Sequence, residues 1–187
     1  EQKELFSHYP APPPPVRVPL TTYPSHACSY LPDRIATTRG VFAADFDADI
    51  YTRFLDANFR RSGRLIYQPV CKGCRQCVSI RVPVNRFAPS KTQRRVLRRN
   101  SDLHLHVTSA VADHERFDLY RRYCQSWHKH DEAPTYLDFE RFLYDSPVES
   151  IDFSYRDAVG KLLAVGVCDV SSSALSSVYF YFDPDES

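Results

Sequence analysis

The 187-residue sequence contains no methionine and no apolar run near the roughly 18 to 20 residues that a membrane-spanning helix requires. Its N-terminus lacks the basic-then-apolar order of a secretory signal peptide. No internal repeat, no serine–histidine–aspartate order and no phosphate-binding loop is evident. These absences favour a soluble, cytoplasmic protein without a membrane partner, and the missing methionine predicts a processed or trimmed start. A chain of this length buries about 70% of its unfolded surface, so it can form a core without disulfides.

Acidic residues are absent from residues 60–100, although this stretch holds 12 of the 24 lysines and arginines. The net charge of +1 conceals the asymmetry, because residues 131–187 carry 3 basic and 12 acidic side chains. A basic block of this kind is typical of a protein that binds a polyanion, since each neutralised phosphate releases condensed counterions. The alternative is a solvated basic face that pairs with the acidic C-terminal half.

The N-terminal part is predicted to combine an extended arm with a small folded module. Residues 1–24 contain seven prolines and show neither a helical nor a strand period, which predicts an arm outside the core. The apolar spacing that follows Asp45, with Asp45 as the cap, predicts an amphipathic helix. Two short strands, at residues 65–69 and 78–84, are expected on either side of a cysteine-rich knuckle.

The predicted domain boundary lies near residue 100. A basic helix over residues 91–99, capped by Ser90, closes an N-terminal domain of residues 25–100. Residues 101–187 form a second domain, so the predicted fold class is α+β, with a cysteine-containing α/β module in front. The second domain is expected to run strand, helix, helix, strand, strand, strand, over residues 103–108, 112–129, 135–144, 150–155, 162–170 and 175–182.

Four of the six cysteines form one pattern, in which Cys28 stands alone and Cys71-x-x-Cys74-x-x-Cys77 follows. A disulfide framework is not expected in a cytoplasmic chain, whereas two-residue spacings let thiolates converge on one metal. Three ligands on a knuckle with a distant fourth suit tetrahedral zinc and equally suit a 4Fe-4S cluster. Alternatively, Cys28 is a small core residue and the knuckle is redox-active or free of metal.

Five longer motifs stand out in the sequence, and they are Cys28-Ser29-Tyr30-Leu31-Pro32, Phe59-Arg60-Arg61-Ser62-Gly63, Tyr67-Gln68-Pro69-Val70-Cys71, Pro89-Ser90-Lys91-Thr92-Gln93-Arg94-Arg95 and Tyr179-Phe180-Tyr181-Phe182-Asp183-Pro184. These motifs resemble the aminoacyl-tRNA protein transferases, and within them the bacterial aspartate/glutamate leucyltransferases. The second half resembles the C-terminal domain of that family, which has the GNAT acyltransferase fold. The order read here stops after the fourth strand of such a domain, so its C-terminal part is expected to be missing.

The resemblance implies transfer of an amino acid from aminoacyl-tRNA to the N-terminal amine of a protein that begins with Asp or Glu. Leucine is the expected donor and arginine the alternative, and the product is a destabilising N-terminus. The partners are then aminoacyl-tRNA and the acidic protein start, and no CoA is expected. A non-catalytic, metal-stapled RNA-binding module is a rival hypothesis, and a CoA-dependent acetyltransferase follows from the fold alone.

Candidate residues follow from what this reaction needs. Arginine pairs with carboxylates through two parallel hydrogen bonds, so Arg75 and Arg81 are predicted to grip the acidic side chain, or alternatively to offset the charge of the thiolates. Tyr179 and Tyr181 share one face of the last strand and are the predicted catalytic residues, although aromatic strand residues are more often core. The predicted tRNA contacts are Lys91, Arg94, Arg95, Arg98 and Arg99.

Overall fold

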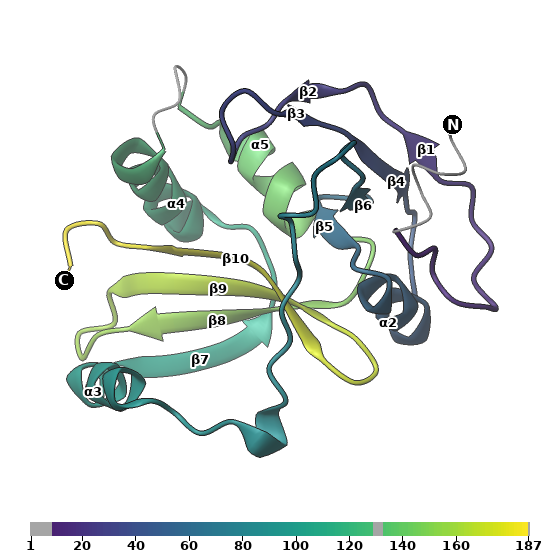
Figure 1. The fold of residues 1–187 in the computed structure, drawn as a ribbon. Helices are drawn as coiled ribbons and strands as arrows, with labels where there is room; N and C mark the ends of the chain where they lie inside the picture. The colour runs from purple at the N-terminus through teal and green to yellow at the C-terminus, as the bar shows by residue number, and fades with distance from the viewer. Residues whose placement is uncertain (1–8, 129–132, 187) are drawn as a thin grey trace.

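The computed structural model describes residues 9–128 and 133–186, and two four-stranded antiparallel sheets organise it (Figure 1). The N-terminal sheet has the order β1–β4–β6–β5, and a separate two-stranded ribbon pairs β2 with β3. The bounds are Thr21–Thr22 for β1, His26–Ala27 for β2, Ile35–Ala36 for β3, Thr38–Phe42 for β4, Arg60–Ser62 for β5 and Leu65–Pro69 for β6.

One short helix, α2 (Ala48–Asp56), packs against this sheet and forms the N-terminal core. Its Tyr51 and Phe54 are fully buried with Ile66 of β6, as expected for residues three apart on one helix face. Asp47 caps the helix by accepting a hydrogen bond from the Ile50 amide at 2.7 Å. The predicted cap, Asp45, is therefore wrong by two residues, although the helix itself is confirmed.

Two further predictions for this half need correction. The arm joins the core, because Val16, Val18 and Leu20 pack against it and β1 pairs with β4. Residues 1–8 of the arm lie outside the described residues. The strand predicted at residues 78–84 is wrong, because that segment has no strand partner among the described residues and ends in the 3-10 turn η1 (Val84–Arg86).

The second sheet has the order β10–β9–β8–β7, and its strands are antiparallel throughout. The predicted succession of strand, two helices and three strands is confirmed within the described residues, while Lys129 lies outside them. The bounds are His104–Ser109 for β7, His114–Trp127 for α4, Tyr136–Phe139 for α5, Glu140–Tyr144 for the π-helical turn η2, Ser150–Arg156 for β8, Leu162–Val170 for β9 and Leu175–Phe182 for β10.

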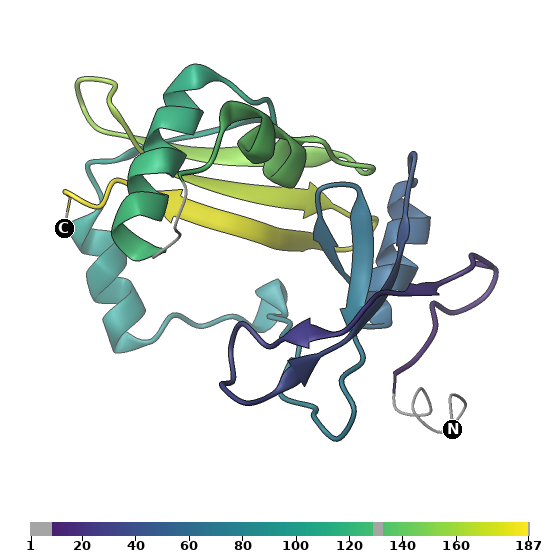
Figure 2. The same ribbon diagram turned by 90° about the horizontal axis from the view of Figure 1, so that it is seen from above.

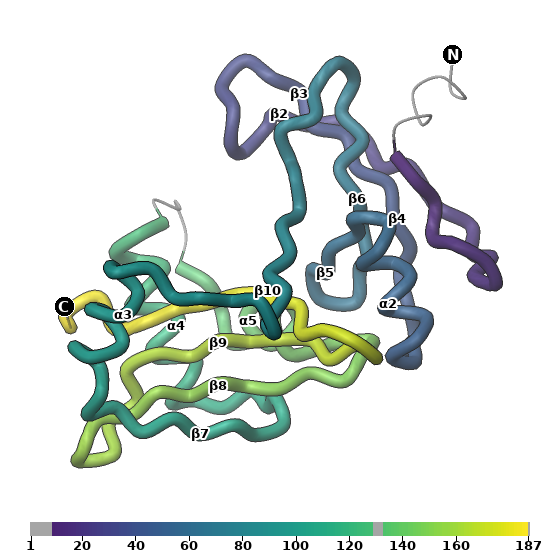
Figure 3. The backbone as a smooth tube through the Cα atoms, turned by 60° about the horizontal axis from the view of Figure 1, so that its bottom comes forward, coloured from purple at the N-terminus to yellow at the C-terminus, as the bar shows by residue number. Residues whose placement is uncertain are grey.

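Helices α4 and α5 cover one face of the second sheet and bury the larger core (Figure 2). Leu119 of α4 and Phe139 of α5 pack there with Val165, Val167 and Tyr181 of the sheet. The basic helix α3 (Lys91–Arg99) lies on the other side of the sheet. A long irregular connection from β6 leads to α3 across the molecule (Figure 3).

A buried ion pair joins the two sheets. Arg61 of β5 donates through Nε to Asp169 of β9 at 2.8 Å, and both side chains are fully buried. The Tyr51 hydroxyl and the Ser150 hydroxyl also donate to this carboxylate, at 2.8 and 2.7 Å. Asp169 therefore anchors the second sheet to the N-terminal sheet and to α2.

Within the residues that the structure describes, no helix is long and apolar enough to cross a membrane.

Candidate functional site

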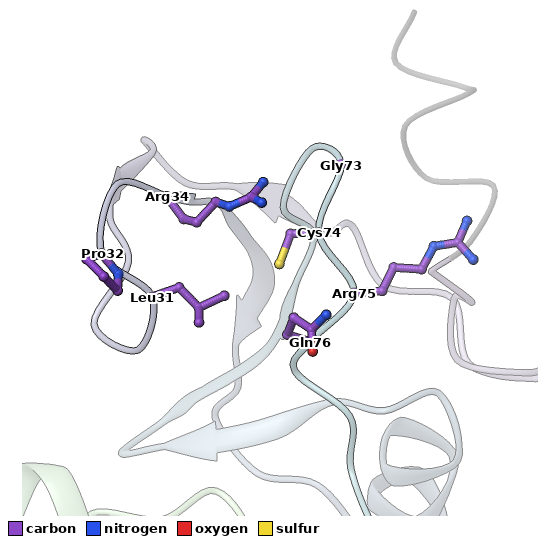
Figure 4. Close-up of a pocket in the computed structure, with 7 residues that line it drawn as sticks. All are labelled: Leu31, Pro32, Arg34, Gly73, Cys74, Arg75 and Gln76. Carbon is purple, nitrogen blue, oxygen red and sulfur yellow. The ribbon is translucent and has the colours of Figure 1, made fainter.

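The predicted knuckle and the turn between β2 and β3 enclose a pocket of about 300 Å³ (Figure 4). Gly73 has a φ of +67°, a left-handed conformation that suits glycine and lets the loop reverse. The Tyr9 hydroxyl fastens the loop by donating to the backbone carbonyl of Cys74 at 2.8 Å. The pocket is lined by Leu31, Pro32, Arg34, Gly73, Cys74, Arg75 and Gln76.

The cysteines gather around this loop without forming a coordination sphere. Burial raises the pKa of Tyr9 most, and the nearby thiols of Cys71, Cys74 and Cys77 raise it further. Cys71 Sγ instead contacts the backbone of Thr37, whose amide lies 3.5 Å away. In residues 9–128 and 133–186, no three histidine, cysteine or carboxylate side chains lie close enough together to hold a metal. The all-sulfur donor set suits zinc or iron, but the described conformation does not present a preformed site.

The two arginines that were predicted to bind substrate have different surroundings in the structure. Arg81 donates to Asp56 of α2 at 2.7 Å, so its guanidinium is already paired. Arg75 lines the pocket, but its guanidinium points to the far side of the loop from Leu31. Arg34, which the sequence interpretation missed, reaches across the pocket toward Gly73 and Cys74. Among the described residues, neither Arg34 nor Arg75 has a carboxylate partner.

The predicted RNA-binding helix forms as expected. Ser90 and Gln93 make a capping box at the start of α3, in which each side chain bonds the backbone of the other. None of the nine residues of α3 is buried, so the helix is held by its cap rather than by packing. Its basic side chains are therefore exposed together, and they are Lys91, Arg94, Arg95, Arg98 and Arg99.

The two predicted catalytic tyrosines have different surroundings. Tyr181 has an exposed fraction of 0%, and its hydroxyl is hydrogen-bonded to the Tyr144 hydroxyl at 2.8 Å. Tyr181 does not reach the surface in this structure, which argues against the predicted contact of its hydroxyl with substrate. Tyr179 is half-buried, and its hydroxyl lies 2.9 Å from Nε2 of His128 at the end of α4. Burial raises the pKa of Tyr179 to about 12, so its phenol stays protonated at neutral pH.

His128 carries no sequence signal for this pairing, because 51 residues separate it from Tyr179. The register of β10 shifts between Ser177 and Tyr179, and such a bulge changes the direction of the side chain that follows. The sequence gives a weak signal for Arg34 as a site residue, since Arg34 follows Cys28 within the same short turn. The site thus contains an arginine-lined pocket, an exposed basic helix and a tyrosine–histidine pair.

Comparison with known proteins accounts for this combination. The family model for the N terminus of arginine-tRNA-protein transferase matches residues 26–95. The model for the C terminus of the same family matches residues 115–187. Together they cover the cysteine pattern, most of the basic helix and the tyrosine strand, so the two halves of the molecule define an aminoacyl-tRNA protein transferase.

Curated relatives agree with that class. The chain is 41% identical over 166 residues to the aspartate/glutamate leucyltransferase of Hahella chejuensis, covering 87% of this chain and 70% of that protein. It is 40% identical over 164 residues to the enzyme of the same name from Pseudomonas putida strain W619, covering 86% of this chain and 69% of that protein. The chain belongs to the arginine-tRNA-protein transferase family, and relatives named aspartate/glutamate leucyltransferase match most of its length.

Proposed function

We propose that this protein transfers leucine from leucyl-tRNA to the N-terminal amine of proteins that begin with Asp or Glu. The observation that carries the proposal is the match to aspartate/glutamate leucyltransferases, which spans both halves of the chain. The exposed arginines and the half-buried tyrosine supply groups that this chemistry needs. The product is a protein with a new N-terminal leucine, which marks it for degradation.

The RNA is held by α3 in this proposal. Lys91, Arg94, Arg95, Arg98 and Arg99 present positive charge on a helix that no other element covers within the described residues. Phosphate contacts of this type position an RNA without reading its sequence. The domain of residues 25–100 therefore supplies the RNA contacts, and the GNAT-like domain of residues 101–187 supplies the acyl-transfer groups.

The acidic side chain of the protein substrate binds in the pocket beside the knuckle. Arg34 faces this pocket and has no ion-pair partner among the described residues. A guanidinium can hold a carboxylate through two parallel hydrogen bonds, which an uncharged asparagine side chain cannot match in strength. Arg75 contributes at the rim, while Arg81 first has to leave Asp56 before it can contact substrate.

Transfer requires the amine nitrogen to attack the ester carbonyl carbon of the aminoacyl-tRNA. The carbon–nitrogen bond forms, the bond from the carbonyl carbon to the ribose oxygen breaks, and the amine gives up a proton. Tyr179 is the proposed catalytic residue, because its protonated hydroxyl can hydrogen-bond the reacting groups from a half-buried position. The hydroxyls of Tyr181 and Tyr144 are hydrogen-bonded to each other, and this bond holds the neighbouring part of β10 in place.

We further propose that Cys28, Cys71, Cys74 and Cys77 bind zinc or an iron-sulfur cluster after the loop closes around it. The support is their spacing in the sequence, together with the Tyr9 hydroxyl, which contacts the backbone carbonyls of Cys71 and Cys74. Such a group would hold the knuckle in one shape, and no reaction step is assigned to it. Metal and sulfide analysis of anaerobically purified protein tests this directly. About one zinc, or iron with matching sulfide, is expected per chain, and protein with neither at full activity would refute it.

The activity itself is tested by labelling peptides that begin with Asp, Glu or Ala, using leucyl-tRNA and arginyl-tRNA in parallel. The proposal predicts leucine transfer to the Asp and Glu peptides and little to the Ala peptide. Transfer of arginine in place of leucine would correct the donor. Tight tRNA binding without any product would instead support a non-catalytic RNA-binding module.

A further inference from the structure

Tyr179 and His128 are the pair of side chains that the structure brings together at the exposed end of α4 and β10. The Tyr179 hydroxyl and His128 Nε2 lie 2.9 Å apart, which is hydrogen-bonding distance. Trp127, next to His128, is 62% exposed, so this corner of the second domain is open to solvent. The bulge before Tyr179 sets the direction of its side chain.

We propose that His128 is the proton acceptor of the transfer reaction and that it acts through Tyr179. This inference rests on the proposed function and assigns to it a residue that neither the sequence nor the family match singles out. The Tyr179 hydroxyl contacts the incoming amine, and His128 lies behind it. His128 is therefore a positioning and proton-accepting residue, whereas Tyr179 touches the substrate.

The chemistry needs such an acceptor. A free α-amino group has a pKa of about 7.7 to 8.0, so most of it is protonated at neutral pH, and the attacking nitrogen must shed protons as the amide forms. Tyr179 cannot serve alone as the base, because burial raises its pKa to about 12 and its phenolate is scarce. A neutral imidazole accepts protons near pH 6.5, which suits this task.

The protonated amine first gives one proton to the solvent, and the remaining proton then follows a path that balances. As the carbon–nitrogen bond forms, a proton passes from the amine to the Tyr179 oxygen while the phenol proton passes to His128 Nε2. The carbon–oxygen bond to the ribose then breaks, and His128 returns a proton by the same route to the departing ribose oxygen. His128 and Tyr179 end in their starting states, and the products are the amide and free tRNA.

The groups that face His128 from α4 and β10 are aromatic rings and a thiol-bearing residue. Tyr123 of α4 packs its ring 5.5 Å from the His128 ring, and Tyr179 faces it from β10. Cys124 contributes its backbone carbonyl, which accepts from the His128 amide at 2.8 Å, and burial raises the pKa of its thiol. Burial also raises the pKa of Tyr123. These three neighbours are therefore neutral at pH 7.

The test compares His128→Gln, Tyr179→Phe and the double variant with the full chain, using leucyl-tRNA and a peptide that begins with Asp. Each single substitution is expected to lower kcat about 100-fold or more, the usual contribution of a general base, with KM changed less than about threefold. The double variant is expected to be no slower than the slower single variant, because the two residues act as one unit.

Tyr123→Phe is the matched control, because it keeps the ring that packs on His128 and lies outside the proton path. Its kcat is expected to stay within about twofold of wild type, and the urea midpoint of His128→Gln should match that of wild type. A His128→Gln variant that keeps at least a third of wild-type kcat, or a double variant that is clearly slower than both single variants, would overturn the inference. Wild-type protein that transfers nothing would instead refute the proposed function.

Discussion

Arg61 and Asp169 form the contact that holds the two halves of the molecule together at the scale of single residues. The Arg61 guanidinium also donates to the carbonyl of Leu143 at 3.1 Å, so one side chain contacts β9 and the end of η2. Burial, followed by the Asp169 carboxylate, raises the pKa of Tyr51, which keeps its hydroxyl protonated as a donor to Asp169. Removing one partner from such a buried pair is costly, because the other charge stays buried without compensation.

Replacing Asp169 by Ala is predicted to destabilise the protein by about 3 to 5 kcal/mol, because Arg61 is left as an unpaired buried charge. Urea unfolding followed by the fluorescence of the single tryptophan, Trp127, measures the change. Asp56→Ala is the control, since it breaks the exposed Arg81 pair and should cost less than about 1 kcal/mol. Equal destabilisation of the two variants would show that Arg61–Asp169 is not an anchor.

Asp152 gives a prediction about pH. Its carboxyl is fully buried, one of its oxygens has no hydrogen-bond partner among the described residues, and burial raises its pKa to about 6 despite Arg116. An unfolded aspartate titrates near pH 3.9, so between about pH 4 and pH 6 the folded state holds the extra proton. The contribution of Asp152 to stability therefore falls as pH rises through this window, by about 3 kcal/mol in total.

Asp152→Asn removes this titration while it keeps the shape of the side chain. The free energy of unfolding of wild type, minus that of Asp152→Asn, is predicted to fall as pH rises from 4 to 6.5 and then to stay constant. Urea titrations of both proteins at several pH values provide the measurement. A constant difference across that range would mean that Asp152 titrates normally in the fold.

At the scale of elements, α3 is the part whose role depends least on packing. Its side chains are exposed along the whole helix. Removing a phosphate-binding arginine from it should therefore weaken RNA binding without unfolding the protein. Surface substitutions of this kind change stability by less than about 0.5 kcal/mol.

Arg95→Gln and Arg98→Gln are each predicted to make the slope of log K against log salt for tRNA binding less steep. The magnitude of the slope falls by about 0.7 to 0.9 for each phosphate that the helix no longer neutralises. Titration of tRNA between about 50 and 200 mM salt measures the slope, because phosphate contacts show their effect over this range. Arg121→Gln is the control, because Arg121 lies on α4 and pairs with Asp118. An unchanged slope in both α3 variants would place the RNA elsewhere.

Helices and strands were predicted correctly where local sequence signals determine them, and wrongly where a contact with a distant segment determines the structure. Ser90 and Gln93 specify the start of α3 on their own, and the alternation of apolar and polar residues over 103–108 specifies β7. The strand expected at residues 78–84 failed because its valines and isoleucine have strand propensity but no neighbouring strand within the described residues. The burial of Tyr181 and the pairing of Asp169 depend on contacts between distant segments, which no local pattern contains.

At the scale of the whole molecule, the proposed site is divided between the two halves. The arginine pocket lies beside the knuckle of the N-terminal half, whereas Tyr179 and His128 belong to the second sheet and its helix. A substrate that must contact both halves depends on their fixed arrangement, which the Arg61–Asp169 pair provides. The family models match both halves, at residues 26–95 and 115–187.

The knuckle gives a prediction at the same scale. Cys74→Ser is expected to lower bound metal and transfer together, because the pocket is built on the loop that carries Cys74. Cys168→Ser, on β9, is the control and should keep both. Parallel measurement of metal content and of leucine transfer checks this, and a Cys74→Ser protein with full turnover and no bound metal would contradict it.

The central claim is that an acidic protein start is recognised by charge and then receives leucine. The most direct measurement is the ratio of kcat/KM for two peptides that differ only in Asp or Asn at the first position, with leucyl-tRNA as donor. The account predicts a ratio of at least about 100 for wild type, in line with the energy of a charged hydrogen-bonded pair, and a much smaller ratio for Arg34→Ala. A wild-type ratio near one would contradict the account.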